Sequence, residues 1–286
     1  MEQVVLFGMG ATKAGTSWLH RYLDTHPDTY FRAVKELHYW SFGGPMGRAA
    51  FVERLEERRD GLLERGQQAA DRRNRVALER IARNLTDVED LIVLQADPSN
   101  EAYHTFLTEG GEDARLVGDV TPAYALCDAE TLAAMQDLAP QTRFIYLMRE
   151  PVSRLWSHVR MNAERSGTDD MAETANRIFE EWEAGDWTDI TARGDYAGAI
   201  ARLSQVIQPD RLMILFYEDL FSQQVVDRIC AFLDLAPHPA DFEKKILASA
   251  PLPMSDTQRR RARARLQPQY DAALAHLGQL PAKWAA

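Results

Sequence analysis

Short runs of consecutive apolar residues alternate along this chain with longer segments in which apolar residues recur every three or four positions. Short apolar runs are typical of strands that are buried on both faces of a parallel sheet. Runs of this kind predict strands at residues 3–8, 29–31, 115–119, 143–149 and 211–217. The segments between them have helical periodicity, so the pattern predicts an α/β fold with a central, mainly parallel five-stranded sheet flanked by helices.

The longest interval without a strand lies between the second and third predicted strands. Residues 47–90 are rich in charge and carry apolar residues at helical spacing. They predict a helical insertion of two surface helices, broken near Gly61 or Gly66. Further helices are predicted at about 174–183, 195–206 and 255–277. Because no linker-like segment and no internal repeat interrupts the pattern, we expect a single domain over residues 1–286.

Composition and charge exclude several classes of protein. The net charge of −10 argues against nucleic acid as a partner, since duplex binding depends on an excess of Lys and Arg. The two cysteines, Cys127 and Cys230, are too few and too far apart for a disulfide framework or a zinc site, and we expect no metal. No apolar stretch approaches the roughly 18 residues of a membrane helix, and the first apolar run belongs to a strand rather than a signal peptide. We therefore expect a cytoplasmic protein without stable membrane insertion.

The first candidate for chemistry is the turn that follows the first predicted strand. Residues 7–19 read FGMGATKAGTSWL, and a glycine-containing turn between a strand and a helix presents backbone N–H groups to an anion, most often phosphate. Gly10 and Gly15 have the spacing of a Walker A loop, but Thr16 stands where that motif requires lysine. The lysine lies inside the loop instead, as Lys13. The loop therefore predicts a phosphate site in a P-loop-like three-layer fold, with a cation placed differently from that of an ATPase.

A second candidate segment follows the fourth predicted strand. Residues 143–157 read RFIYLMREPVSRLWS, and Arg149 should emerge at the edge of the sheet where ligands bind in open α/β folds. Pro151 suits the first turn of a helix, so Ser157 lies two turns into that helix. An arginine and a hydroxyl at this spacing can bind a second phosphate. The alternative is that Arg149 pairs with a carboxylate and Ser157 is satisfied within its helix.

Together, the two segments resemble motifs of the sulfotransferase family that uses 3′-phosphoadenosine 5′-phosphosulfate (PAPS). In that family, T-K-[AS]-G-T-[ST]-[WF]-L holds the 5′-phosphosulfate and R-[DNE]-P-x-x-R-x-x-S holds the 3′-phosphate. Three further segments are similar to motifs of carbohydrate-type and bacterial members, in the same chain order. They are VKELHYW at 34–40, GDVTPAY at 118–124 and LFYEDL at 215–220. The resemblance covers roughly residues 1–235.

The resemblance implies how PAPS would be bound. Lys13 would stabilise the negative charge that grows on the departing phosphate. Arg149 and Ser157 would hold the 3′-phosphate, which ATP lacks. Trp18 would lie against the adenine, with a role as a core aromatic as the alternative. The cofactor-binding residues implied by the resemblance are Lys13, Ala14, Gly15, Thr16, Ser17, Trp18, Arg149, Ser157 and Tyr217.

The acceptor side depends on the segment around residue 36. The resemblance assigns the general base to Glu36, for which a surface salt bridge is the alternative role. His38 is the rival base, on the same face as Glu36 if this piece is extended. Lys35, Asp119 and Thr121 are expected near the substrate. The alternative for Lys35 is a solvated lysine without a role at the site. The alternative for Asp119 and Thr121 is a structural cap.

The sequence therefore predicts an enzyme, a PAPS-dependent sulfotransferase that acts by in-line displacement. The acceptor would be a hydroxyl, or secondarily an amine, of a small molecule, lipid or glycan, and the product would include adenosine 3′,5′-bisphosphate. The alternatives are a P-loop nucleotide kinase and a non-catalytic nucleotide-binding protein. Val120 departs from the family, because many carbohydrate members have lysine there. The basic run at 259–265 is interpreted as a solvated helix face, with the cofactor entrance as the alternative.

Overall fold

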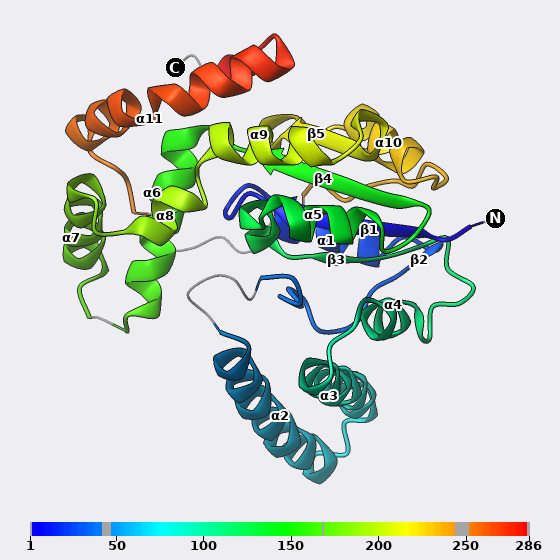
Figure 1. The fold of residues 1–286 in the computed structure, drawn as a ribbon. Helices are drawn as coiled ribbons and strands as arrows, with labels where there is room; N and C mark the ends of the chain where they lie inside the picture. Colours follow the sequence, from blue (N-terminus) through cyan, green and yellow to red (C-terminus); the bar gives the residue numbers. More distant parts are fainter. Residues whose placement is uncertain (1, 42–46, 168, 244–251, 285–286) are drawn as a thin grey trace.

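The computed structural model describes residues 2–41, 47–167, 169–243 and 252–284. Figure 1 shows a central sheet with helices on both faces and a long helical hairpin that extends away from it. The five strands have the order β2-β3-β1-β4-β5, and every pairing is parallel. The α/β fold and the parallel five-stranded sheet predicted from the apolar pattern are confirmed.

The strands form close to where the apolar runs predict them. They are β1 (Val4–Gly10), β2 (Thr29–Tyr30), β3 (Leu116–Val120), β4 (Thr142–Met148) and β5 (Leu212–Phe216). Every residue of β1 is buried, which is why this strand is written as a continuous apolar run. The chain runs from β1 to the β2 edge, then from β3 across to β4 on the other side of β1. This change of direction makes the carboxyl ends of β1 and β4 the expected ligand-binding crevice.

Side-chain caps mark the first residue of several of the flanking helices. They are α1 (Thr16–Asp24), α4 (Asn100–Thr108), α5 (Ala129–Gln136), α6 (Pro151–Arg165), α7 (Met171–Ala184), α8 (Thr188–Ala192), α9 (Tyr196–Val206), α10 (Gln223–Phe232) and α11 (Asp256–Leu277). At the start of α6, the Glu150 carboxylate accepts hydrogen bonds from the N–H groups of Val152 (3.1 Å) and Ser153 (2.7 Å). None of the described helices is long and apolar enough to cross a membrane.

The predicted helical insertion is present, but its turn is not where the sequence predicts it. The two helices are α2 (Arg48–Asp71) and α3 (Arg75–Ala96), so the break predicted at Gly61 or Gly66 is wrong. A glycine inside a helix costs only about 1 kcal/mol, and the buried face of α2 continues past both glycines. The chain turns instead at Arg73, which is left-handed with φ 51°, and the Asn74 side chain caps α3.

One buried arginine joins this hairpin to the sheet. Arg32 follows β2 and is 6% exposed. Its guanidinium lies 2.9 Å from Asp87 and 3.1 Å from Asp90 of α3, and its Nε donates to the Phe106 carbonyl of α4 at 2.6 Å. Because the segment after β2 also carries residues 35–38, these contacts fix the hairpin relative to the candidate site.

Candidate functional site

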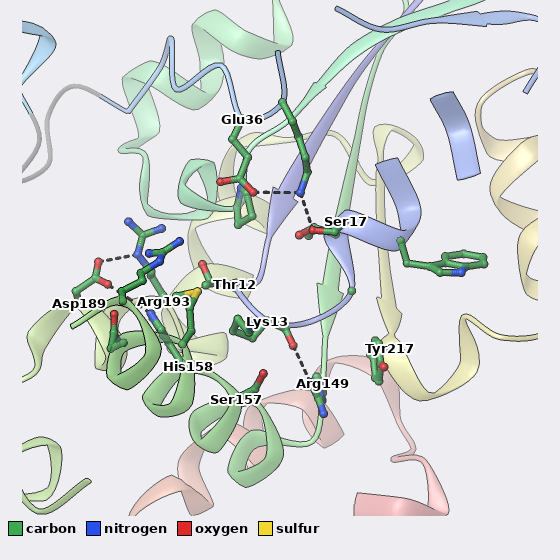
Figure 2. Close-up of a pocket in the computed structure, with 18 of the residues that line it drawn as sticks. Thr12, Lys13, Ser17, Glu36, Arg149, Ser157, His158, Asp189, Arg193 and Tyr217 are labelled. Atoms are coloured by element: carbon green, nitrogen blue, oxygen red, sulfur yellow. Dashed lines mark hydrogen bonds and ion pairs between the residues drawn. The ribbon is translucent and has the colours of Figure 1, made fainter. Parts of the chain in front are cut away.

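A cavity of about 580 Å³ lies at the carboxyl ends of β1 and β4, with walls from the loop after β1, the segment after β2, α6, α8 and the turn after β5 (Figure 2). Most of the residues that the sequence nominates line it: Lys13, Gly15, Thr16, Ser17, Trp18, Lys35, Glu36, His38, Arg149, Ser157 and Tyr217. The other nominated residues, Ala14, Asp119 and Thr121, are buried outside its lining. Segments far apart in the sequence thus meet at one site.

The loop after β1 has the shape of an anion site. Gly15 has φ 96°, and a Cβ there would come within 2.6 Å of the Tyr217 ring, so glycine allows the loop to pass close to the turn after β5. The N–H groups of Thr16 and Ser17 belong to the first turn of α1, where no preceding helical carbonyl can accept them. The N–H of Ala14 differs, because it donates to the Ala11 carbonyl at 3.1 Å. The groups presented to the cavity are therefore those that follow Ala14.

Arg149 joins the two predicted phosphate-binding segments. Its Nη1 donates to the Lys13 carbonyl at 3.2 Å, and its guanidinium carbon lies 4.8 Å from the centre of the Tyr217 ring. The Tyr196 hydroxyl holds the backbone of Arg149, accepting from its N–H at 3.1 Å and donating to its carbonyl at 2.7 Å. Ser157 lines the same cavity from α6. Among the described residues Arg149 forms no ion pair with a carboxylate, so the alternative role considered for it is not formed.

Positive charge is concentrated at this cavity. Its lining cations are Lys13, Lys35, Arg54, Arg149, Arg165 and Arg193, and its lining carboxylates are Glu36 and Asp189. The whole chain carries −10, so the excess of cations is local. Burial lowers the pKa of Lys13, and the nearby arginines, Arg149 first, lower it further. Such a cavity attracts anionic ligands.

Lys35 links the start of α1 to the candidate base. Its Nζ donates to the Ser17 hydroxyl at 2.7 Å and to Glu36 Oε1 at 3.1 Å. The other carboxylate oxygen of Glu36 lies 4.0 Å from His38 Nε2. The side chain of Glu36 is 41% exposed, so it is open to an acceptor that enters the cavity. Figure 2 shows Glu36 on the opposite side of Lys13 from Ser157 and Arg149.

The segment that carries these groups is not an extended strand. Glu36 has φ 60° and His38 has φ 53°, both in the left-handed region that side chains other than glycine rarely adopt. Lys13 shares this conformation with φ 70°. The extended geometry considered for this piece is thus absent, yet both side chains line the cavity. Left-handed residues of this kind cost about 1–3 kcal/mol each and cluster at functional sites.

The surroundings of His38 favour its neutral imidazole form. Burial lowers its pKa, and Arg193 and Arg54 lower it further, while Glu36 acts in the opposite direction. Its Nδ1 lies 3.3 Å from the Ser41 hydroxyl, which orients the ring. A neutral histidine can accept a proton, so His38 retains the chemical capacity of a base.

Asp119 and Thr121 support the site from below instead of lining it. The Asp119 carboxylate accepts hydrogen bonds from the hydroxyls of Thr121 (2.7 Å), Tyr103 (2.9 Å) and Tyr124, and from the Leu37 N–H (3.4 Å). Asp119 is 2% exposed and Thr121 is fully buried. Neither residue lines the cavity, so their expected place near the substrate stays a prediction. Asp119 contacts the backbone of the left-handed segment at Leu37, which is similar to the structural cap considered as its alternative role.

Several residues that line the cavity were not among those nominated from the sequence. Thr12 Oγ1 and Asn162 Nδ2 are buried polar atoms at the cavity wall that have no hydrogen-bond partner among the described residues. On α6 a signal was available, since the cavity-lining residues recur on one helical face: Ser157, His158, Met161, Asn162 and Arg165. Asp189 lies in α8 and Arg193 directly follows it, and this helix is too short to give a periodic pattern.

Comparison with known proteins assigns the fold and the family of the molecule. The model of the family described as "Sulfotransferase family" matches residues 6–239. No curated protein matches the chain. Among solved structures, a sulfotransferase from Alicyclobacillus acidocaldarius is similar, with a TM-score of 0.65 and 21% identity over 100% of both chains. This similarity shows that the two proteins share a fold.

Other similar solved structures include two sulfotransferase domains. The sulfotransferase domain of the Synechococcus PCC 7002 olefin synthase has a TM-score of 0.48 and 18% identity, over 92% of this chain and 94% of its own. A sulfotransferase domain from the curacin biosynthetic pathway has a TM-score of 0.47 and 19% identity, over 93% of this chain and 97% of its own.

Proposed function

The chain belongs to the sulfotransferase family, and we propose that it transfers the sulfuryl group of PAPS to an acceptor hydroxyl, with an amine as the second acceptor type. One observation carries the proposal. The two segments that we predict to bind phosphate are joined by the hydrogen bond from Arg149 to the Lys13 carbonyl, and they share a cavity with a carboxylate, Glu36. A donor that is phosphorylated at two positions needs two anion sites, and an acceptor that must lose a proton needs a base in the same cavity.

The described residues fit PAPS. The cavity of about 580 Å³ is of the size that small-molecule ligands use, about 300–1,000 Å³. The buried Thr12 Oγ1 and Asn162 Nδ2 have no hydrogen-bond partner in the described part of the chain, as expected where a polar ligand completes the hydrogen bonds. The N–H groups from Gly15 to Ser17 would hold the 5′-phosphosulfate. Arg149 and Ser157 would hold the 3′-phosphate.

The adenine would bind among the aromatic residues at the other wall. Trp18 lines the cavity, stacks on Phe242 with ring centres 5.9 Å apart, and meets Phe221 edge to face at 5.4 Å. Tyr217 lies 5.1 Å from Phe221 and under Arg149. Trp18 is also part of the hydrophobic core, so its packing role and its ligand role coexist.

The chemistry follows from where the charges lie. When bound, PAPS supplies the sulfuryl group: a bond forms from the acceptor oxygen to sulfur while the bond from sulfur to the bridging phosphate oxygen breaks. Lys13 would stabilise the charge left on that phosphate oxygen. Glu36 would take the proton of the acceptor hydroxyl. Lys35, bonded to both Ser17 and Glu36, would hold the base at the transfer point.

We further propose that the protein works in the cytoplasm on a small-molecule, lipid or glycan acceptor. Its two cysteines are free and buried, as is usual in a reducing compartment. The local excess of cations at the cavity suits small anionic ligands, and the overall negative charge does not suit nucleic acid.

Transfer of label tests the proposed reaction. The protein would be incubated with PAPS labelled in its sulfuryl group and with pools of hydroxyl and amine compounds, in parallel with ATP labelled in its γ-phosphate plus magnesium. We expect labelled sulfate ester and adenosine 3′,5′-bisphosphate in equal amounts. Transfer of labelled phosphate, with none of sulfate, would make the protein a kinase and overturn the proposal.

A further inference from the structure

The end of the cavity away from the cofactor residues has its own charged groups. Arg193 follows α8 and lines the cavity, as do Asp189 of α8 and Arg54 of the helical hairpin. In Figure 2, Asp189 and Arg193 lie on one side of Lys13, and Arg149 and Tyr217 lie on the other. Arg193 is also close enough to His38 to lower its pKa. This cation therefore belongs to the acceptor end, where Glu36 and His38 lie.

The hydrogen bonds of Arg193 leave one edge of its guanidinium for a ligand. Its Nε donates to Asp189 Oδ1 at 2.6 Å. The backbone N–H of Arg193 donates to the Asp189 carbonyl at 3.0 Å, and the two terminal nitrogens of its guanidinium donate to no residue in the described parts of the chain. These nitrogens form the flat fork that matches two oxygens of a carboxylate, sulfonate or phosphate. The side chain is 23% exposed, so such a contact would be partly shielded from water.

The carboxylates nearby do not neutralise this end. One carboxylate oxygen of Asp189 accepts from Arg193, and the other lies 3.7 Å from His158 Nε2. Glu36 is already engaged by Lys35. Arg165, at the last turn of α6, adds a further cation to the cavity wall. An anion at this position would offset charge that the protein itself leaves in excess.

Resting on the function proposed above, we propose that the acceptor is an organic anion: a hydroxyl compound with a second, negatively charged oxyanion group that Arg193 binds. The two-point contact, with Arg193 at the anion and Glu36 at the hydroxyl, orients the reacting oxygen toward the transferred group. Arg193 is thus a specificity-determining residue. Asp189 sets the direction of its guanidinium.

Binding of matched probes tests the proposal without requiring turnover. The probes are 4-hydroxyphenylacetate, its neutral amide and the cation tyramine, with 4-hydroxybenzenesulfonate as a second anion. Affinities are measured by calorimetry on the protein saturated with adenosine 3′,5′-bisphosphate. We expect at least one of the two anions to bind ten-fold or more tighter than the neutral amide, and tyramine to bind most weakly. Preference for the carboxylate or the sulfonate identifies the anionic group.

Three variants separate recognition from structure. Arg193→Gln should remove the preference for the anion, with the affinity of the amide changed less than two-fold. Asp189→Asn should strengthen anion binding, because it removes a competing carboxylate. The matched control is Arg177→Gln, which removes a similar pair four residues apart, with Glu181 on α7, away from the cavity. It should change none of these affinities.

Two results would overturn the inference. One is equal or undetectable binding of the anions and the amide by the wild-type protein. The other is an Arg193→Gln variant that keeps the anion preference. Loss of the proposed function gives a different result, since the protein would then fail to bind adenosine 3′,5′-bisphosphate at the start of the experiment.

Discussion

Three side chains that carry the proposed chemistry project from left-handed backbone: Lys13, Glu36 and His38. Each conformation is unfavourable for a residue with a Cβ, so the surroundings must impose it. For the pair after β2, the surroundings include the buried Asp119 carboxylate and the Thr121 hydroxyl, which accept long hydrogen bonds from the N–H groups of Leu37 (3.4 Å) and His38 (3.5 Å). At the residue scale, the site is built by backbone that is forced to aim particular side chains into one cavity.

The role of Glu36 is tested by its isosteric amide. Glu36→Gln keeps the shape and a hydrogen-bond acceptor for Lys35 but cannot take a proton. We expect turnover to fall by about 10²–10⁴-fold, with the affinity for adenosine 3′,5′-bisphosphate unchanged. Initial rates of sulfate transfer and calorimetry measure the two quantities. If turnover is retained in Glu36→Gln and lost in His38→Gln, the histidine is the base.

The role of Arg149 is tested by two nucleotides that differ in one phosphate. Arg149→Ala removes a charge-assisted contact, so we expect adenosine 3′,5′-bisphosphate to bind about 10–100-fold more weakly and adenosine 5′-phosphate to change little. Arg143→Ala is the control, because Arg143 lies near the opposite end of β4, outside the cavity lining. Equal losses for both nucleotides would remove Arg149 from the 3′-phosphate.

The pH dependence of the reaction should report Lys13. Folding lowers its pKa below the ordinary 10.5 through burial and through Arg149, Arg160 and Arg165, against the weaker opposing charge of Glu164. The charged form is the active one, so kcat/KM for PAPS should fall with rising pH at a pH below 10.5. Arg149→Gln removes one repelling charge and should move this fall to higher pH. An unchanged position would contradict the assignment.

At the scale of elements, the strands were predictable because burial leaves them few polar positions. The ends of β1, β4 and β5 fall within two residues of the predicted ones. The break in the hairpin was not predictable from glycine alone, because Gly61 and Gly66 are tolerated inside α2. Of the candidate site, the loop after β1 and the start of α6 could be predicted from sequence motifs. The contribution of α8 depends on tertiary packing, and a helix of five residues is too short to give a sequence pattern for it.

The attachment of the hairpin rests on Arg32, and this gives a stability test. Arg32→Met would leave the Asp87 carboxylate, which is 2% exposed, without its charged partner, and the Ala33 N–H would still donate to its other oxygen. Removing one member of a buried pair costs about 3–5 kcal/mol, so the free energy of unfolding should fall by this order. Asp90→Asn removes the half-exposed partner and should cost less than about 1 kcal/mol.

Urea denaturation followed by circular dichroism measures both variants. The hairpin also carries Arg54 at the cavity wall. Loosening it in Arg32→Met should therefore weaken acceptor binding more than cofactor binding. Similar stability losses for Arg32→Met and Asp90→Asn would mean that the buried contact with Asp87 is not what holds the hairpin.

At the scale of the whole molecule, buried histidines should make the fold sensitive to acid. Burial and the cations Arg154, Arg193, Lys13 and Arg165 lower the pKa of His158 from 6.5 to about 2, although Asp189 lies nearby. As pH falls below 6.5, the unfolded chain takes up a proton at this position and the folded protein does not. The free energy of unfolding should fall by about 1.4 kcal/mol per pH unit from this histidine.

Stability measured from pH 6 to pH 4 checks this expectation. His158→Gln should flatten the pH dependence, because glutamine does not titrate. His20 makes a second contribution of the same sign, since burial and Lys35 lower its pKa to about 4. A His158→Gln variant with the same slope as the wild type would show that this histidine is protonated in the folded protein.

The charge of the cavity lining is opposite in sign to the net charge of the whole molecule. A chain of net charge −10 gathers six cations around one cavity, where they face two carboxylates. The sequence motifs were sufficient to identify the family, and most of the residues that they nominate line one cavity. They did not reveal the cations of the acceptor end, because these come from the hairpin, from the end of α6 and from the residue after α8.

The most direct test of the central claim is the choice between two nucleotides. A ligand that binds only the folded state raises the melting temperature, and at equal concentration the tighter ligand raises it more. We expect adenosine 3′,5′-bisphosphate to stabilise the protein strongly, through the Lys13 loop and the clamp of Arg149 and Ser157, and ATP with magnesium to stabilise it little. Stronger stabilisation by ATP with magnesium than by the bisphosphate would contradict the account.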